Sequence, residues 1–459
     1  MQDHLLNSEL REYFTTNNVE ALRAFVEKTT PAMTAEYLDA FDPAEIWQVI
    51  RTVKPAIGAE IFTFLNEDVQ MEIAATIKRD EIARLLTEMS ADDRVDLLKN
   101  IPEERRQNIM PALAKAERED IRRLSAHKEG TAGSVMTSDY AILSPALTVS
   151  QAIDRLRLEA PDKETIYYAY VVDETRKLVG FVSLKDLILA RPNAPISKIM
   201  HSEVISVHVA DDQETAARLI QKYDLIALPV INGGEVLVGI ITHDDAIDII
   251  TQEHTEDMEK FMAIGGSHEG AVYMKTSILG HFRNRAPWVA ALAILGLVSG
   301  FIVQSFEGLL MQFTVLAAFM PMLADTGGNT GSQSATLVVR ALALKEITTK
   351  DILCILTREF QISLLLAVLL GLIAFLRVIY LGGGSTIPDS YSLIRIGFAI
   401  SLALGLQVVT STLVGALLPL GAAKLKLDPA VVASPALTTI VDITGLLIYF
   451  MTAKLLLRV

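Results

Sequence analysis

The chain has 459 residues, of which 51% are hydrophobic, and it carries a formal net charge of −14. This length predicts more than one domain. The single cysteine, Cys354, excludes an intrachain disulfide and a cysteine-cluster metal site. The eight histidines show no HxH or HExxH spacing, which argues against a transition-metal enzyme site.

Charge divides the chain into two unlike halves. From Lys275 to the end there are 13 Lys and Arg against 8 Asp and Glu, whereas the preceding residues hold 28 basic and 47 acidic ones, a balance of −19. Such an acidic surface attracts cations and repels nucleic acid, although acidity can also serve solubility alone. The first residues lack the apolar core of a signal peptide, so we expect this acidic half to stay in the cytosol.

Residues 1–130 have the pattern of an all-α domain. Short amphipathic segments such as RDEIARLLTEM and SADDRVDLLKNI each open with an acidic or proline cap and recur about every 12 to 18 residues. This spacing predicts stacked short helices in a small superhelix. Asp92 and Asp93 begin one of them, where they are explained equally well as helix caps or as metal ligands.

Residues 131–250 contain an internal duplication. SVMTSDYAIL and KIMHSEVISV each lead to an amphipathic helix, two apolar strands and a closing helix, and the strand pairs end in VGFVSLKDL and VGIITHDDA. This α/β pattern resembles a tandem pair of CBS domains, which implies a regulatory module that binds adenine nucleotides or ions. In that resemblance Tyr170 and Asp186 are candidates for contacting ATP.

Residues 251–280 form a predicted connecting helix that is rich in acidic side chains. Like charges about 5 Å apart repel by about 3 kcal/mol at an effective dielectric near 20. A solvated helix tolerates this repulsion, but the position between an acidic domain and a membrane domain favours a surface bridged by cations.

Residues 281–459 predict a membrane domain of about five helices. The spans are expected at 286–306, from about 309 onward, and at about 360–376, 396–420 and 431–457. The loops at 340–358 and 424–426 are basic, whereas those around Glu307 and at 382–392 have no Lys or Arg. The positive-inside rule therefore places the N-terminal half in the cytosol and the C-terminus outside, in a multi-pass protein of the plasma or inner membrane.

The last span carries one ionisable side chain near its middle, Asp442. A carboxylate at this depth costs at least ~2.5–3.5 kcal/mol and marks a functional position by default. We interpret Asp442 as a cation ligand in a pore; the alternative is a protonated aspartic acid bonded to a neighbouring helix. The second span contains the polar segment GGNTGSQ, expected near the cytosolic end, where Asn329 and Gln333 can offer oxygens or the small residues simply permit close packing. Gln407, Ser411 and Gly415 form a polar strip in the fourth span.

Taken together, the domain order and the motifs NRAPW, PMLADTGGNTGSQSAT and TTIVDITGLLIYF resemble the MgtE family of magnesium transporters. The resemblance implies a homodimer with its pore on the two-fold axis, closed by cytosolic Mg²⁺. It implies pore ligands at Asp442, Thr438 and Asp428, and Asn329 lies within the matching motif. It also implies regulatory metal ligands at Asp245, Asp248, Glu253, Glu256, Asp257, Glu214 and Asp224, with counterparts at Glu60 and at Asp92 or Asp93. Asp325 receives no role from the resemblance.

The chemistry of the ion agrees with this assignment. Mg²⁺ loses its waters reluctantly, so a few carboxylates with retained water suit it better than a closed cage of protein ligands. Few ligands also let the ion leave, as conduction requires. First-row metals such as Mn²⁺ and Co²⁺ outrank Mg²⁺ in raw affinity for most sites, so the sequence leaves selectivity open.

Three rival functions fit parts of the pattern. A CBS-gated anion transporter is disfavoured because Asp442 has no intramembrane Lys or Arg beside it in the predicted spans. An intramembrane aspartyl protease using Asp442 and Asp325 needs two adjacent carboxylates; the predicted depths of the two residues differ, and the GxGD motif is absent. A sensor that does not transport is disfavoured by the polar strips. The sequence therefore predicts a transporter rather than an enzyme.

Overall fold

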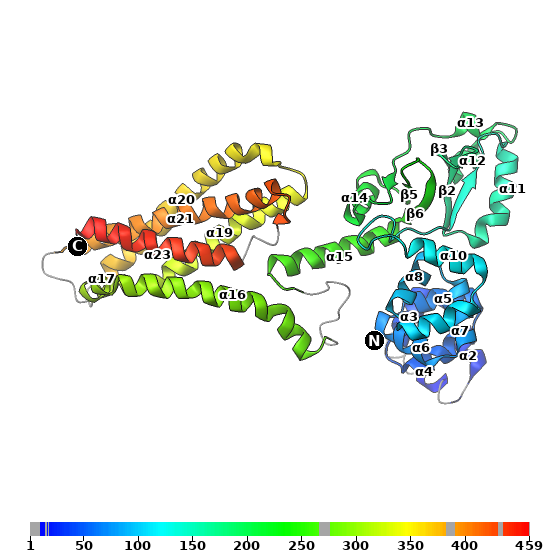
Figure 1. Cartoon of the computed structure of the whole chain (residues 1–459), viewed down its shortest axis with the longest axis horizontal. Helices are drawn as coiled ribbons and strands as arrows, with labels where there is room; N and C mark the ends of the chain where they lie inside the picture. The colour runs from blue at the N-terminus through cyan, green and yellow to red at the C-terminus, as the bar shows by residue number, and fades with distance from the viewer. Residues whose placement is uncertain are drawn as a thin grey trace. The chain divides into compact units, whose positions relative to one another are not determined.

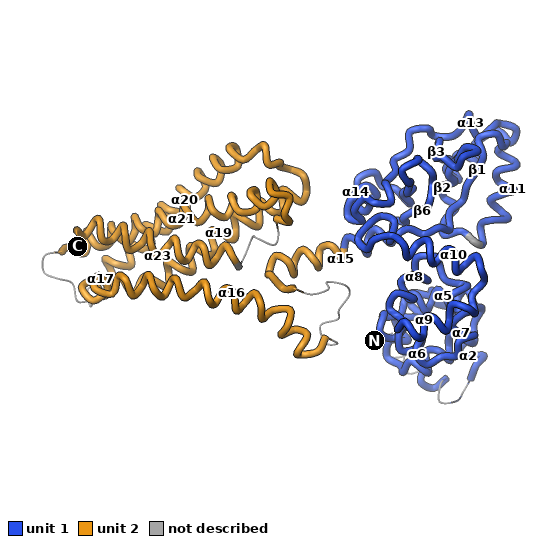
Figure 2. The backbone as a smooth tube through the Cα atoms, viewed as in Figure 1, with its two compact units in different colours: residues 1–250 blue, residues 251–459 orange. Residues whose placement is uncertain are grey.

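The computed structural model describes residues 10–13, 16, 18–265, 276–381, 391–429 and 435–458. The chain divides into two compact units, Met1–Ile250 and Thr251–Val459, shown in blue and orange in Figure 2. Parts of the predicted connecting segment, of the loop at 382–392 and of the start of the last span lie outside the described residues. Each unit is described by itself.

The first unit begins with a two-row stack of short helices (Figure 1). Alternate helices pack together, α3 on α5 on α7 and α4 on α6 on α8, so that the rows form the predicted superhelix. Several helices begin at a proline or an acid-rich first turn, as the cap signals predicted. The helices are α2 (Val19–Lys28), α3 (Pro31–Leu38), α4 (Pro43–Ile50), α5 (Pro55–Thr63), α6 (Glu67–Thr76), α7 (Arg79–Glu88), α8 (Ala91–Asn100), α9 (Glu103–Ile109) and α10 (Lys115–Leu124).

The rest of the first unit repeats one arrangement twice, as the duplication predicted. Each half has a three-stranded sheet in which the first strand is parallel to the second and the second antiparallel to the third. The first half contains β1 (Tyr140–Leu143), α11 (Val149–Glu159), β2 (Thr165–Val172), β3 (Leu178–Ser183), α12 (Leu184–Leu189) and α13 (Ile196–Ile199). The second contains β4 (Val207–His208), α14 (Gln213–Tyr223), β5 (Ala227–Ile231), β6 (Leu237–Thr242) and α15 (His243–Phe261).

Two glycines explain why the motifs VGF and VGI recur with the methionine-containing entry segments. A Cβ on Gly180 would lie 2.8 Å from the carbonyl oxygen of His201, and a Cβ on Gly239 would lie 2.5 Å from Sδ of Met136. Each entry segment therefore crosses a third strand so closely that only glycine fits. The repeated sequence pattern records a repeated packing requirement.

The second unit is a bundle of five long helices (Figure 1). They are α16 (Ile278–Ser305), α19 (Met320–Ala343), α20 (Ile352–Leu381), α21 (Leu393–Lys424) and α23 (Pro435–Leu457). By length and composition, α16, α20, α21 and α23 are apolar enough to cross a membrane within the described residues. Among these five, α19 alone falls below that threshold, because the polar segment GGNTGSQ lies inside it.

The second span differs from its prediction in where it starts. Residues 307–317 do not extend the span but form two short helices, α17 (Glu307–Gln312) and α18 (Thr314–Ala317). Phe313 and Leu316 are fully buried there and pack in the core beside α21 and α23. A run of apolar residues therefore marked burial within the bundle, which periodicity alone does not distinguish from a membrane span.

Candidate functional site

Three helices of the membrane unit, α19, α21 and α23, approach one another through glycine. A Cβ on Gly415 of α21 would lie 2.2 Å from the carbonyl oxygen of Gly331 in α19. A Cβ on Gly328 of α19 would lie 3.4 Å from Cγ2 of Thr438 in α23. The small residues of GGNTGSQ thus serve close packing, the alternative that the sequence left open.

A buried amide is enclosed where these helices meet. Gln407 of α21 is 1% exposed, and its Nε2 donates to the carbonyl oxygen of Leu323 at 2.9 Å. Its side chain fills the space that Cβ atoms at Gly327 and Gly445 would occupy. Its Oε1 is buried without a hydrogen-bond partner in the described structure, which leaves an acceptor inside the bundle.

Asp442 lies on α23 one turn after Thr438 and one turn before Gly445. The carboxylate is half-buried, and its Oδ1 is shielded from solvent without a hydrogen-bond partner among the described residues. Among the described residues of the protomer, Oδ1 of Asp442 therefore lacks the partner on a neighbouring helix that the alternative of a protonated aspartic acid requires. An unsatisfied carboxylate oxygen at this depth needs a proton or a cation.

The polar residues of α19 lie beside Asp442 rather than near the cytosolic end of the helix. Gly331 faces Leu437, and Gly327 faces Val441, which precedes Asp442. In the same helix Asp325 and Asn329 are exposed on the protomer, and Nδ2 of Asn329 donates to Oδ1 of Asp325 at 3.1 Å. Asp325 and Asp442 therefore lie at similar levels of the bundle, unlike the predicted arrangement, because α19 begins at Met320 rather than near residue 309.

Sequence analysis missed a buried carboxyl group, Glu359 of α20. The residue is 9% exposed, and Oγ of Ser334 in α19 donates to its Oε2 at 2.8 Å. An acidic residue inside the apolar run ILCILTREFQISLLLAVLL was the signal that could have identified it. This bond ties α20 to the glycine-containing helix α19.

A lysine stands at the predicted metal position between the connecting helix and the loop before α23. Nζ of Lys260 lies 3.3 Å from Oδ2 of Asp428 and also pairs with Glu256. Partial burial, together with the charge of Asp428, raises the pKa of Asp257. Burial lowers the pKa of Lys260, but its bonds to Glu256 and Asp428 outweigh that effect and raise it. The predicted ligands Glu256, Asp257 and Asp428 are thus brought together around an ammonium group.

The first unit gathers a second set of acids where α8 meets the start of α15. Burial and the charge of Asp245 raise the pKa of Asp92 well above its usual value, and Oδ1 of Asp92 is buried without a partner. Burial raises the pKa of Asp245 to about 6, against the opposing hydrogen bonds from Thr242. The structure therefore places Asp92 and Asp245 close enough for their charges to interact, with Asp248 on the same helix.

Two further acids in this region were missed. Partial burial and the charge of Asp245 raise the pKa of Glu164 to about 7, and burial raises the pKa of Asp139. The backbone N–H of Glu164 donates to the carbonyl oxygen of Asp139 at 2.8 Å. Both residues sit just before a strand, where no local pattern signalled them. We call Asp92, Asp93, Asp139, Glu164, Asp244, Asp245 and Asp248 the hinge acids.

Other predicted ligands lie apart from these two groups. Glu60 is exposed on α5, and Glu214 pairs with Arg218 one turn further along α14. Asp224 has φ of 50° and ends α14 in the left-handed conformation, a local role that aspartate tolerates. Glu253 lies on α15, one turn before Glu256. Within the described ranges, no three His, Cys, Asp or Glu side chains are close enough to hold a metal ion.

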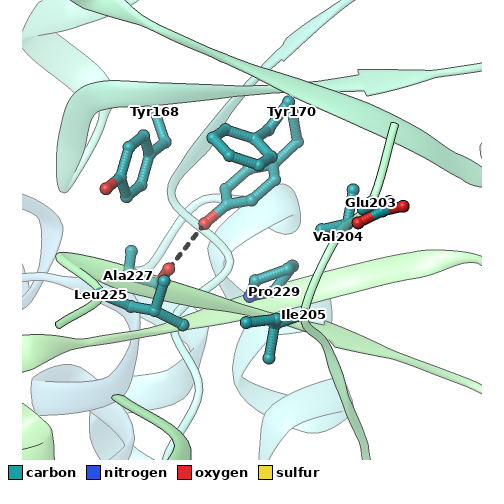
Figure 3. A pocket seen from close by; sticks show the side chains of 9 residues that line it. Tyr168, Tyr170, Glu203, Val204, Ile205, Leu225, Ala227 and Pro229 are labelled. Carbon is teal, nitrogen blue, oxygen red and sulfur yellow. Dashed lines mark hydrogen bonds between the residues drawn. The ribbon is translucent and has the colours of Figure 1, made fainter. Parts of the chain in front are cut away.

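The CBS pair contains a pocket of about 120 Å³ (Figure 3). Its walls come from both halves, with Tyr168 and Tyr170 on one side and Leu225 and Pro229 on the other. Phe181 also lines the pocket. The hydroxyl of Tyr170 donates to the carbonyl oxygen of Ala227 at 3.2 Å. Apolar walls with a few polar groups are typical of small-molecule sites.

Asp186, the other nucleotide candidate, has local partners. It does not appear among the residues that line the pocket. Its Oδ2 accepts from Oγ of Ser183 at 2.6 Å, as in a helix cap, and lies 3.1 Å from Nε2 of His201. The structure therefore places only Tyr170 of the two candidates at the pocket.

Comparison with known proteins accounts for each of these regions. The MgtE divalent cation transporter family matches residues 320–452, the MgtE intracellular N domain matches 29–130, and CBS domains match 132–193 and 196–252. The magnesium transporter MgtE of Thermus thermophilus is 38% identical over 77% of this chain and 76% of its own length. That of Bacillus subtilis is 37% identical over 74% of this chain and 73% of its own. The chain belongs to the MgtE family.

Solved structures agree with this membership. The soluble part of a magnesium transporter superposes with a TM-score of 0.52 at 31% identity, covering 55% of this chain and 99% of its own. The cytosolic domain of the Mg²⁺ channel MgtE in complex with ATP gives a TM-score of 0.50 at 34% identity, covering 53% and 99%. The predicted order of a helical domain, a CBS pair and a helical membrane region is confirmed.

Proposed function

We propose that this protein carries Mg²⁺ across the cytoplasmic membrane, with Asp442 as a ligand of the ion path. Family membership supports the reaction class, since MgtE relatives matched over about three quarters of the chain are magnesium transporters. The observation that carries the site is the buried Oδ1 of Asp442, which has no hydrogen-bond partner among the described residues. A hydrated cation supplies what this oxygen lacks.

The ion path requires a second copy of the chain. One protomer places no three metal-ligating acids together in its described parts, so one chain cannot surround an ion with charge. A two-fold dimer doubles Asp442 and the backbone and hydroxyl oxygens of Thr438, leaving room for retained water. This arrangement binds the ion weakly enough to release it.

The orientation follows from loop charge. Arg340 lies in the last turn of α19, and Lys345 and Lys350 lie between α19 and α20. Lys424 ends α21, and Lys426 follows it. These ends face the cytosol, together with the N-terminal half, and the C-terminus faces outside. The solved relative that matches the first half of the chain is described as a cytosolic domain.

Mg²⁺ also closes the transporter from the cytosolic side in this proposal. Burial, together with repulsion from neighbouring carboxylates, raises the pKa values of Asp92, Asp245 and Glu164 among the hinge acids. A divalent ion between them removes that repulsion and favours a compact arrangement. Shifting the ratio of closed to open protein from 1:99 to 99:1 requires the ions to bind the closed form ~5.5 kcal/mol more tightly than the open form, which several modest sites can supply together.

The pocket of the CBS pair is assigned to ATP. Tyr168, Tyr170 and Phe181 offer aromatic surface for an adenine ring. The related cytosolic domain was solved with ATP. Glu203 also lines the pocket and can accept hydrogen bonds from ribose hydroxyls.

The test is Mg²⁺ flux into proteoliposomes, with native protein compared with Asp442→Asn. Flux should fall to the level of empty vesicles in Asp442→Asn and persist in the control Asp351→Asn, an exposed cap before α20. Undiminished flux in Asp442→Asn would contradict the pore assignment. Co²⁺ and Mn²⁺ flux measured in the same vesicles separates Mg²⁺ transport from transport of another divalent ion.

A further inference from the structure

We propose that Asp325 is a second cation-binding carboxylate of the ion path, at the level of Asp442 on the neighbouring helix. The inference rests on the proposed function and deepens it, because it adds a residue that sets affinity for the entering divalent ion. Its basis is the geometry of α19 against α23.

The level of Asp325 is fixed by close contacts between antiparallel helices. A Cβ on Gly328 would lie 3.4 Å from Thr438, and a Cβ on Gly327 would lie 3.0 Å from Val441. Because the helices run antiparallel, these two contacts place position 325 opposite positions 441–443. Asp325 and Asp442 therefore lie within one helical turn of each other along the bundle.

The face of α19 that carries Asp325 is polar and exposed. Asp325, Asn329 and Gln333 follow at intervals of four residues, and all three are exposed on the protomer. The opposite face holds the buried small residues Gly327, Gly331 and Ser334. Exposing a carboxylate to hydrocarbon costs at least ~2.5–3.5 kcal/mol, so this face meets water or a second copy rather than lipid.

Local structure does not explain the carboxylate. Asp325 is the sixth residue of α19, too far from the start at Met320 to cap the helix. Within the described segments it has no ion pair with Lys or Arg, and its hydrogen-bond partner is the amide of Asn329. That bond engages Oδ1 and fixes the orientation of the carboxylate while Oδ2 remains available.

The second, independent observation is on α23. Asp442 presents a buried oxygen without a hydrogen-bond partner at the same level. Two carboxylates in each chain become four in a dimer, enough to attract a hydrated divalent ion while water completes its octahedron. Asp442 then forms the inner contact and Asp325 raises the local cation concentration beside it.

The first experiment measures Mg²⁺ flux against external Mg²⁺ concentration for native protein, Asp325→Asn, Asp325→Glu and the control Asp351→Asn. Asp325→Asn should raise the half-saturating concentration about tenfold, the loss typical of a weakened metal site. Asp325→Glu should recover most of it, and Asp351→Asn should match native protein. Saturation unchanged in Asp325→Asn, with Asp442→Asn inactive, would overturn this inference and leave the proposed function intact.

A second measurement stays decisive if Asp325→Asn folds poorly. Cys354 is the only cysteine, so Cys354→Ser allows single cysteines at position 325 and, as the lipid-facing control, at Leu365, which is 74% exposed on α20. A charged thiol reagent should modify Asp325→Cys, Mg²⁺ should slow that reaction, and Leu365→Cys should not react. No reaction at position 325, or a rate independent of Mg²⁺, would overturn the inference. Absence of Mg²⁺ flux in native protein would instead contradict the proposed function.

Discussion

The two units use carboxylates in opposite ways. In the first unit the hinge acids are numerous and near one another, and burial raises the pKa values of Asp92, Glu164 and Asp245. In the membrane unit the acids near the glycine contacts are few, and Asp325 and Glu359 each accept one hydrogen bond from a described residue. Many repelling charges make a sensor that a cation can compact, whereas few charges make a path that a cation can leave.

The largest expected effect is on the close packing of α21 against α19 in the membrane unit. Gly415→Ala places a Cβ 2.2 Å from the carbonyl oxygen of Gly331, which is backbone and cannot rotate away. We expect a loss of stability of about 3 kcal/mol or more and loss of flux. Thermal unfolding in detergent should show this, with Gly421→Ala as the control on the same helix, since its Cβ meets nothing within 4 Å. Equal melting temperatures would show that the helices are further apart than described.

Glu359 should contribute through its hydrogen bond rather than through charge. Glu359→Leu leaves Oγ of Ser334 without its acceptor inside the bundle and should cost about 1–3 kcal/mol. Glu359→Gln keeps an acceptor and should stay within about 1 kcal/mol of native stability. Thermal unfolding of both variants checks this. A Glu359→Gln loss as large as that of Glu359→Leu would indicate that the charge itself matters, as in an ion site.

The hinge acids predict a pH dependence of the sensor. Burial raises the pKa of Asp245 to about 6 and that of Glu164 to about 7, so ionisation of these two groups destabilises the close arrangement. The penalty appears as the pH rises above the usual carboxyl range and is complete for these two groups above about pH 7. At pH 8 the arrangement should therefore need Mg²⁺, whereas near pH 5.5 protons replace it.

Limited proteolysis of the full chain measures this dependence. Millimolar Mg²⁺ should slow cleavage at least about tenfold more at pH 8 than at pH 5.5. Glu164→Gln combined with Asp245→Asn should reduce the difference, and Glu36→Gln, on an exposed face of α3, should not. Protection that is independent of pH would contradict the assignment of these acids as the sensor.

The smallest effect is expected at Lys260, whose ion pairs are partly exposed. Lys260→Met removes the ammonium group from between Glu256 and Asp428, and such pairs contribute about 0–1 kcal/mol to stability. The concentration of cytosolic Mg²⁺ that halves flux should shift by a few-fold, because a divalent ion must then neutralise these acids alone. An unchanged value would show that Lys260 does not compete with the cation. Lys350→Met is a matched exposed control.

Much of this organisation could be predicted from local patterns. The repeated VG motifs predicted the CBS pair because each glycine lies under a crossing entry segment. The single acid in an apolar run identified Asp442. The start of α19 could not be predicted, since Phe313 and Leu316 are apolar for reasons of bundle packing rather than of lipid contact.

Contacts between segments that are far apart in the sequence could not be predicted either. Glu164 joins the hinge acids only because β2 begins beside α15, and nothing near it in the sequence marks that contact. The level of Asp325 depends on which residues of α23 pack against the glycines of α19. Residue type suggests that the helices pack closely but does not fix this register.

The measurement that tests the central claim most directly is Mg²⁺ flux at low and at millimolar cytosolic Mg²⁺, in native protein, in Asp442→Asn and in the combined variant Asp245→Asn, Asp248→Asn, Glu256→Gln, Asp257→Asn. The account predicts flux in native protein only at low Mg²⁺, no flux in Asp442→Asn at either concentration, and flux at both in the combined variant. Normal inhibition of the combined variant by Mg²⁺, or flux through Asp442→Asn, would contradict the division between a sensing unit and a conducting unit.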